Sequence, residues 1–289
     1  MYHVTIAEAI NKAAAQLSGR GVPNARLDAE LLLRHALGKD RAWLLAHIQD
    51  SLDDISGRLF EGFVNRRATR EPAQHIIGVQ EFWGLEFVVT RVALIPRPET
   101  ELVVESALKE ARGIASPVII DLCTGSGCIA ISLAKEIEGA RLFAIDKSDK
   151  ALAIAHENAR RHGVSDRIRF FEGDLLGPLD ELDLRGKADV ITANPPYIKS
   201  SELHTLQAEV RDFEPEMALI AGPEGTEIAQ RIIDTAHQFL KKGGSLIMEM
   251  GMGQAETLRR MVKDTGKYST IEILKDLAGI ERVLVVKKT

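Results

Sequence analysis

Apolar residues recur at helical spacing through the first 75 residues of the chain. The clearest stripe, which predicts an amphipathic helix because its members are three, four and seven residues apart, is Ala29, Leu32, Leu33, Ala36 and Leu37. A capping-box pattern at Thr5 and Glu8 predicts that an earlier helix begins there. The last helix of this region should end before Pro72. We therefore expect residues 1–75 to fold as a small helical domain with a core of its own.

The spacing of apolar residues changes to every second position after about residue 80. Leu85, Phe87 and Val89 follow this spacing, which favours a strand. We expect the strand to form a β-hairpin with residues 92–95. The hairpin should connect two domains as a linker over residues 76–97.

Short apolar runs alternate with helical segments from residue 98 to the end of the chain. The runs that predict strands cover residues 118–122, 142–145, 168–171, 190–192, 245–250, 270–274 and 282–286. The segments that predict helices cover residues 99–111, 128–137, 149–161, 226–240 and 254–265. Such alternation is typical of right-handed βαβ units. We therefore expect an α/β fold with a doubly wound, Rossmann-like sheet over residues 98–289.

Polar residues stand at the ends of four predicted strands. Asp121 leads into a loop that ends at Gly127, while Asp146, Asp174 and Asn194 stand at or near the ends of the next three strands. In open parallel sheets, ligands bind at the carboxyl ends of the strands, near the point where the strand order reverses. We expect these residues to meet in one ligand site.

The loop after the first strand reads Asp121-Leu122-Cys123-Thr124-Gly125-Ser126-Gly127. Its two glycines allow a sharp turn and let a ligand approach the backbone without a Cβ atom in the way. The loop is not the Gly-x-Gly-x-x-Gly fingerprint of dinucleotide enzymes, because Ala130 stands at the third glycine position. Asp146, at the end of the next strand, is placed to accept hydrogen bonds from the hydroxyls of a ribose.

A rigid polar turn, Asn194-Pro195-Pro196-Tyr197, follows the fourth strand. Two consecutive prolines restrict the backbone, so the Asn194 side chain and the Pro195 carbonyl have few alternative arrangements. Tyr197 places an aromatic side chain directly beside this rigid amide acceptor, at the edge of the sheet where ligands bind.

Composition and charge narrow the classes of function. The 289 residues are 45% hydrophobic and 27% charged, which is ordinary for a globular protein. The net charge is −5, and residues 1–80 carry +1, so neither the whole chain nor its helical part has the basic character of a nucleic-acid-binding protein. Apolar runs are too short for a membrane helix, and the start lacks the pattern of a signal peptide. We expect a cytoplasmic protein with no membrane or nucleic-acid partner.

Residues that commonly bind metals or react as nucleophiles form no recognisable pattern. The histidines are scattered, and Cys123 and Cys128 do not make a zinc site by themselves, so we expect no protein-bound metal. Glu249, at the end of a predicted strand, is interpreted as structural.

Three groups of residues together resemble the peptide chain release factor N(5)-glutamine methyltransferases. The first group is the loop from Asp121 to Gly127, with Asp146 and the Asn194-Pro195-Pro196-Tyr197 turn. The second is Phe82-Trp83-Gly84 with Pro96-Arg97-Pro98-Glu99-Thr100-Glu101. The third is Asp28-Ala29-Glu30-Leu31-Leu32-Leu33 with Arg41-Ala42-Trp43-Leu44-Leu45-Ala46. The turn alone is shared with adenine-N6 methyltransferases, but the combination is specific to this family and covers nearly the whole chain. Cys123 is a departure, because glycine is commoner at that position in the family.

This resemblance implies a class I methyltransferase that takes its methyl group from S-adenosyl-L-methionine. The acceptor it implies is the side-chain amide of the glutamine in the Gly-Gly-Gln tripeptide of peptide chain release factors. The cofactor-binding residues it implies are Cys123, Thr124, Gly125, Ser126, Gly127, Asp146, Asp174, Leu175 and Asn194. Catalysis is implied for Asn194, Pro195 and Tyr197, and substrate binding for these three and Pro196. Arg97, Glu99 and Thr100 are expected near the cofactor, and the helical domain is expected to dock the release factor.

Two other functions stay open at this point. An adenine-N6 methyltransferase acting on DNA or RNA would use the same turn, although it would be expected to carry a basic target-recognition region. A non-catalytic binding module would keep the cofactor site but would not need the turn at Asn194.

Overall fold

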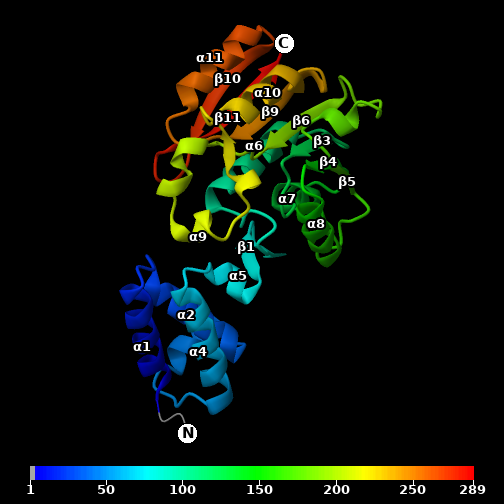
Figure 1. Ribbon diagram of the computed structural model, residues 1–289. Helices are drawn as coiled ribbons and strands as arrows, with labels where there is room; N and C mark the ends of the chain where they lie inside the picture. Colours follow the sequence, from blue (N-terminus) through cyan, green and yellow to red (C-terminus); the bar gives the residue numbers. More distant parts are fainter. Residues whose placement is uncertain (1–3) are drawn as a thin grey trace. The chain divides into compact units, whose positions relative to one another are not determined.

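The computed structural model describes residues 4–289, which divide into two compact units. One unit comprises the chain up to Val79 together with Gln207–Phe213, and the other comprises Gln80–Leu206 and Glu214–Thr289. We call them the helical unit and the sheet unit, and describe each by itself (Figure 1).

The helical unit is a bundle, as predicted. Its helices are α1 (Ile6–Gly19), α2 (Ala25–Leu37), α3 (Arg41–Ala46), α4 (Asp54–Ala68), α5 (Ala73–Ile77) and α9 (Ala208–Arg211). The capping box at Thr5 and Glu8 is present, and the Asp40 side chain caps α3. Side chains from successive helices, among them Ile10, Leu33 and Leu44, are fully buried in one core. The apolar stripes read from the sequence therefore face that core.

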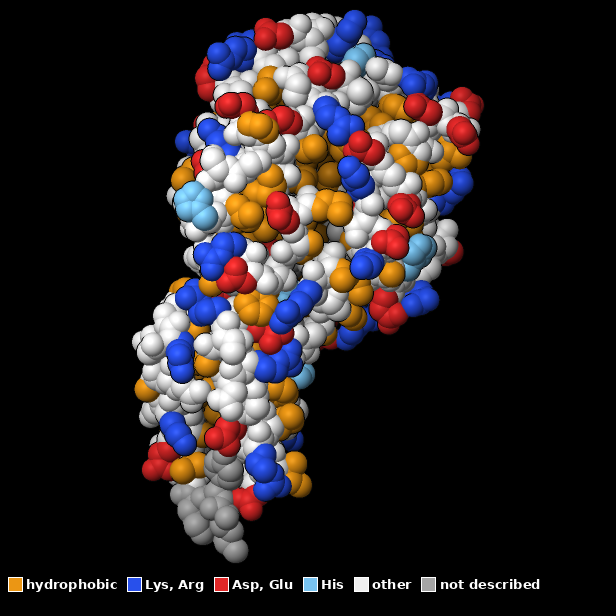
Figure 2. All heavy atoms as spheres, viewed as in Figure 1, with side chains coloured by type: hydrophobic (Ala, Val, Ile, Leu, Met, Phe, Trp, Pro, Cys, Tyr) orange, Lys and Arg blue, Asp and Glu red, His pale blue; other side chains and the backbone are white. Residues whose placement is uncertain are grey.

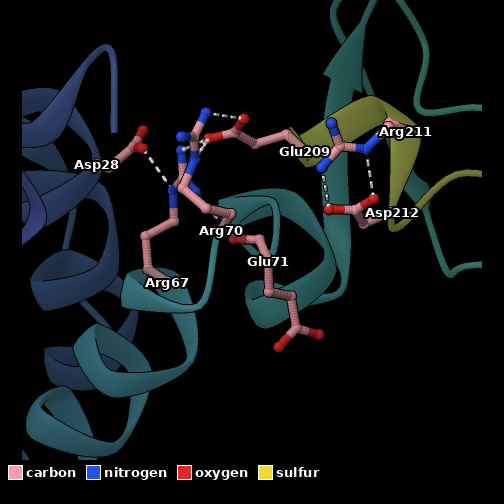
Figure 3. Close-up of polar contacts among 7 residues, drawn as sticks. All are labelled: Asp28, Arg67, Arg70, Glu71, Glu209, Arg211 and Asp212. Carbon is pink, nitrogen blue, oxygen red and sulfur yellow. Dashed lines mark hydrogen bonds and ion pairs between the residues drawn. The ribbon is translucent and has the colours of Figure 1, made fainter. Parts of the chain in front are cut away.

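Ion pairs connect the late segment Gln207–Phe213 to the rest of the helical unit (Figure 3). Arg67, near the end of α4, donates to Asp28 at 2.7 Å and to Glu209 at 2.8 Å. Arg70 donates to the same Glu209 carboxylate. The Arg67 side chain is only 5% exposed, so these charges are paired where water is largely excluded. The sequence pattern did not predict that this segment belongs with the helices.

The connecting hairpin differs from the prediction. It pairs β1 (Val79–Phe82) with β2 (Leu85–Val88), and residues 92–95 form no strand. The reason is the turn between the two strands. Trp83 and Gly84 both have positive φ, of 54° and 66°, which is the backbone of a two-residue hairpin turn.

The sheet unit contains a seven-stranded sheet with the order β10-β11-β9-β6-β3-β4-β5. Its strands are β3 (Val118–Leu122), β4 (Arg141–Asp146), β5 (Ile168–Glu172), β6 (Ala188–Ala193), β9 (Leu240–Glu249), β10 (Tyr268–Lys275) and β11 (Glu281–Lys288). The five strands from β9 to β5 are parallel, whereas β10 and β11 are antiparallel additions at one edge. The predicted doubly wound α/β sheet is confirmed.

Helices cover both faces of this sheet. On one face, α6 (Glu101–Ala111), α7 (Cys128–Glu136) and α8 (Asp149–Arg161) share a core with Ile119 of β3. On the other, α10 (Glu227–Ala236) and α11 (Ala255–Thr265) share a core with Ile120. Neighbouring residues of β3 thus point to opposite cores, and the strand is completely buried. The chain runs from β3 to β4 and β5 and then returns to β6 on the other side of β3, so the strand order reverses between β3 and β6.

Short elements between residues 198 and 222 went unpredicted. In the sheet unit these are β7 (Ile198–Lys199), β8 (Ile220–Gly222) and two 3-10 turns, Ser200–Thr205 and Glu216–Ala218. Elements of two to six residues are too short to produce a periodic pattern. Within residues 4–289, none of the helices combines the length and apolar character needed to span a membrane.

Candidate active site

A pocket lies at the carboxyl ends of β3, β4 and β6 in the sheet unit. Figure 2 shows hydrophobic side chains gathered in a hollow on this unit. The predicted site residues that line the pocket are Cys123, Thr124, Gly125, Ser126, Asp146, Asp174, Leu175, Asn194 and Pro196. Three other predicted residues, Gly127, Pro195 and Tyr197, are not part of its lining.

The loop after β3 turns sharply through two glycines. Gly125 has a φ of 56°, and open space surrounds the position where a Cβ atom would stand, so the backbone is accessible there. Gly127 has a φ of 82° and lies under the loop at the start of α7. A Cβ atom on Gly127 would come within 2.9 Å of Ile131 Cδ1 and 3.2 Å of Ala155 Cβ, so a side chain at this position would crowd α7 and α8 in addition to straining the backbone.

Cys123 is strained in a position that favours glycine. Its φ of 57° lies in the left-handed region, which non-glycine residues adopt at a cost. The thiol lines the pocket, and burial raises its pKa, which keeps it protonated and unreactive near neutral pH.

Asp121, in β3, holds the loop that follows the strand in place. Its carboxylate is fully buried and accepts hydrogen bonds from the hydroxyls of Thr124 at 2.6 Å and Thr192 at 2.7 Å. Burial raises the pKa of Asp121 to about 6, and the two hydroxyl donors act against that rise. Asp121 is outside the pocket lining, so it positions the loop.

Asp146 joins the end of β4 to the glycine loop. One carboxylate oxygen accepts from the Gly125 amide at 2.8 Å, and the other accepts from the Ser148 amide at 2.9 Å. Burial raises its pKa, against the effect of these two donors. Each oxygen retains a second lone pair, so the carboxylate is able to accept further hydrogen bonds from a ligand in the pocket.

Asp174 is paired with a cation that the sequence analysis did not identify. Arg231 of α10 lies 2.8 Å from the Asp174 carboxylate, and both residues line the pocket. The hydrogen bond from Arg231 holds the pKa of Asp174 below its usual value. Arg231 is separated from Asp174 by 57 residues, so no local pattern connects them.

Asn194 is the end of a buried hydrogen-bond relay. Its side-chain Nδ2 donates to Thr100 Oγ1 at 3.1 Å, and the Thr100 hydroxyl donates to Glu249 Oε2 at 2.6 Å. Thr100 and Glu249 are each 1% exposed. Burial raises the pKa of Glu249 to about 7. Glu249 was interpreted as structural, and its connection to Asn194 was not predicted.

Tyr197 lies beside the pocket, half-buried, without entering its lining. Its main-chain oxygen accepts a hydrogen bond from Gln254 Nε2 at 2.9 Å, and the same amide donates to the Gly225 carbonyl. Burial raises the pKa of its phenol, so the hydroxyl stays protonated.

One wall of the pocket comes from segments away from the predicted strand ends, and of these only the stretch around Arg97 was expected near the cofactor. Arg97 lines the pocket and makes two hydrogen bonds to the Glu214 carboxylate, at 2.6 and 2.8 Å. Burial raises the pKa of Glu214, and Arg97 acts against that rise. Further wall residues, from the predicted hairpin strand and from the segment after Glu214, are Val92, Ala93, Leu94, Pro215, Met217, Ala218 and Ile220. Residues 92–95 were predicted to form a strand, whereas the segment after Glu214 gave no periodic signal.

Comparison with known proteins places both units in described families. Residues 8–78 match the family described as PrmC N-terminal domain, and residues 115–283 match a methyltransferase domain. A solved structure with a TM-score of 0.59 and 18% identity, the hMettl16 catalytic domain in complex with an RNA hairpin, covers 74% of this chain and 79% of its own and shares the fold.

Relatives of similar length extend over both units. The release factor glutamine methyltransferase of Geobacter sulfurreducens is 42% identical over 280 residues, which are 97% of this chain and 95% of the relative. The enzyme of the same description from Moorella thermoacetica is 39% identical, over 96% of this chain and 97% of the relative. This identity extends over nearly the full length of each protein, so the chain belongs to the release factor glutamine methyltransferase family.

Proposed function

We propose that this protein transfers a methyl group from S-adenosyl-L-methionine to the side-chain amide nitrogen of the glutamine in the Gly-Gly-Gln tripeptide of release factors. The observation that carries the proposal is that Asn194 and the glycine loop line the same pocket. The proposed site for the methyl donor and a side chain able to accept hydrogen bonds from an amide therefore lie in one cavity. The chain's membership of the family points to the same reaction.

The residues around the pocket fit the proposed donor. The Asp146 carboxylate would accept hydrogen bonds from the ribose hydroxyls, and the exposed backbone at Gly125 would allow the methionine moiety to approach. Leu175 and Asp174 would flank the adenine. When bound, the cofactor supplies an electrophilic methyl group on a positively charged sulfur.

Asn194 and Pro195 are proposed to hold the acceptor. An amide nitrogen is a poor nucleophile because its lone pair is delocalised into the carbonyl group. If Asn194 Oδ1 and the Pro195 carbonyl accept its two N–H groups, they fix its position and stabilise the positive charge that develops during attack. Tyr197, next to these two acceptors, would cover the planar amide and exclude water. The proton then leaves to water, so no strong base is required.

The helical unit is proposed to dock the release factor. It has its own core, a nearly neutral charge, and exposed apolar side chains at Leu27, Leu45, Ile55 and Leu59. Ile55 is 74% exposed, so Ile55→Ser should leave the fold intact. We expect it to raise the KM for intact release factor while leaving the KM for a short Gly-Gly-Gln peptide unchanged. Equal KM values for wild type and variant on the intact factor would contradict a role for Ile55 in docking.

The proposal includes a cytoplasmic location and peptide chain release factors as partners. Translation termination takes place in the cytoplasm, where both substrates are available.

Transfer of label from methyl-labelled S-adenosyl-L-methionine tests the proposed reaction. The acceptors are intact release factor, release factor with the tripeptide glutamine replaced by alanine, and adenine-containing DNA and RNA. We expect label on the intact factor alone. Label on nucleic acid alone would identify an adenine-N6 methyltransferase, and label on none of them would favour a non-catalytic module.

A further inference from the structure

We propose that Thr100 and Glu249 are positioning residues that orient the Asn194 side-chain amide so that its oxygen, and not its NH₂ group, faces the substrate. This inference rests on the proposed function, because it concerns the group that would accept the protons of the glutamine amide.

The topology brings the three residues together. Asn194 directly follows β6 and Glu249 ends β9, and these two strands are parallel neighbours with Ala193 opposite Met248. Their carboxyl ends therefore lie side by side. Thr100 comes from the 3-10 turn Pro98–Thr100 that leads into α6, and its hydroxyl bridges the two side chains.

The direction of the hydrogen bonds settles the orientation of the amide. An ionised Glu249 carboxylate only accepts hydrogen bonds, so the single hydroxyl proton of Thr100 is donated to it. The Thr100 oxygen is then available only as an acceptor, and Asn194 must present its NH₂ group there. Because the oxygen and nitrogen of an amide lie on opposite sides of Cγ, Oδ1 is turned away from Thr100. A flipped amide would set two acceptor oxygens against each other in a buried place.

The charge state of Glu249 controls this direction. Glu249 interacts electrostatically with five other charged or titratable groups, which are Arg97, Glu99, Cys128, Tyr197 and Arg282. Burial raises the pKa of Glu249 to about 7, and the Thr100 hydroxyl and the two arginines oppose that rise. A protonated Glu249 is able to donate to Thr100, which frees the Thr100 proton for Asn194 Oδ1. The relay then permits the unproductive amide orientation, so activity should fall as the pH decreases through about 7.

Variants at both relay positions separate orientation from folding. Thr100→Val keeps the shape and removes the hydroxyl, while Thr100→Ser restores it. Glu249→Gln offers a donor to Thr100 at every pH and so imitates the protonated state. A matched control is Ser245→Ala, because Ser245 is a buried residue in the middle of β9 whose hydroxyl donates to Glu110 at 2.8 Å and takes no part in the relay.

The kinetics of release-factor methylation provide the first readout. We expect Thr100→Val and Glu249→Gln to lower kcat by about tenfold or more, with the Kd for S-adenosyl-L-methionine within about twofold of wild type. In both variants, kcat should no longer fall as the pH decreases through about 7, whereas Thr100→Ser and Ser245→Ala should keep the wild-type kcat and pH profile. Asp121, with a pKa of about 6, bonds Thr124 and Thr192 and is not part of the relay, so its contribution should remain in all variants.

The side-chain amide resonance of Asn194 gives a second readout that does not depend on turnover, and the Asn194→Ala variant identifies it. In wild type this resonance should shift with pH around 7, and in Thr100→Val it should not. The inference would be overturned if both Thr100→Val and Glu249→Gln kept the wild-type kcat and pH profile. It would also be overturned if the Asn194 resonance of the wild type did not shift with pH. If the wild type fails to methylate release factor at all, the proposed function fails, and the resonance still decides whether the relay orients Asn194.

Discussion

The guanidinium of Arg67 lies 2.8 Å from the carboxylate of Glu209, which follows it by 142 residues in the chain. Arg67 is 5% exposed and Glu209 is 13% exposed, so the pair is largely removed from water. Asp28 and Arg70 complete the set of charges (Figure 3). This contact makes Gln207–Phe213 part of the helical unit, although the segments on either side of it belong to the sheet unit.

Removing Glu209 should destabilise the helical unit. Glu209→Ala leaves Arg67 and Arg70 with one carboxylate fewer in a largely buried place, and breaking such a pair costs about 3 kcal/mol in the free energy of unfolding. Denaturant unfolding followed by Trp43 fluorescence in a Trp83→Phe background measures this, because the chain has two tryptophans. Asp212→Ala is the control, since its pair with Arg211 is exposed and should contribute little. Identical unfolding midpoints for Glu209→Ala and the control would contradict the structural role of the pair.

The same carboxylate should make the stability of the helical unit depend on pH in acid. The hydrogen bonds from Arg70 and Arg67 lower the pKa of Glu209 from 4.5 to about 2, against the effect of burial. The stabilisation is therefore fully present above about pH 4.5 and is lost as the pH falls toward 2. Glu209→Gln should be less stable than wild type at pH 6, and this difference should shrink between pH 4.5 and 2. A difference that stays constant over that range would show that Glu209 is not held ionised by its arginines.

Asp146 should matter for binding the donor. Asp146→Ala removes the carboxylate that we propose accepts the ribose hydroxyls, so the affinity for S-adenosyl-L-methionine should fall by about 1.5–3 kcal/mol. Calorimetric titration measures this directly. Asp166→Ala provides the control, because Asp166 is exposed and is not in the pocket lining. Equal affinities for Asp146→Ala and wild type would remove Asp146 from the site.

Cys123 offers a stabilising substitution. Its φ of 57° costs a non-glycine residue about 1–2 kcal/mol of stability. Glycine avoids this strain, although its greater conformational freedom in the unfolded chain offsets part of the gain. We expect Cys123→Gly to raise the unfolding temperature modestly and Cys123→Val to lower it. Cys128→Gly, in the first turn of the adjacent α7, should be destabilising, which separates backbone strain from loss of a thiol. A lower unfolding temperature for Cys123→Gly would contradict the strain at this position.

Local patterns were sufficient to predict the sheet and one side of the pocket. The strands β3, β4 and β6 are apolar runs, and each places its polar residue, Thr124, Asp146 or Asn194, at the carboxyl edge where a parallel sheet collects such residues. These residues are close in space because the carboxyl ends of parallel strands lie at the same edge of the sheet. The alternation of strands and helices in the sequence was enough to predict that parallel arrangement.

Contacts between distant, irregular segments were not predictable in this way. Residues 92–95 continue an apolar stretch and were expected to form a strand, but the two-residue turn at Trp83-Gly84 completes the hairpin earlier, and Val92 and Leu94 become pocket wall. In the sequence, Glu249 looks like any polar residue at the end of a strand. Only its burial and its hydrogen bond from Thr100, which the structure shows, distinguish it from other such residues. Glu214 and Arg231 each have a partner more than 50 residues away.

In the proposed mechanism, Asn194 Oδ1 stabilises the charge that develops on the glutamine nitrogen, and this role is tested by comparing kcat for the wild type, Asn194→Ala and Asn194→Asp. Asn194→Ala should lower kcat on release factor by about 10²–10³, the usual effect of removing a preorganised polar group, while the Kd for the donor changes little. Asn194→Asp keeps an acceptor oxygen and should retain more activity than alanine does. If Asn194→Ala turns over release factor at nearly the wild-type rate, Asn194 is only a turn residue and the proposed chemistry is wrong.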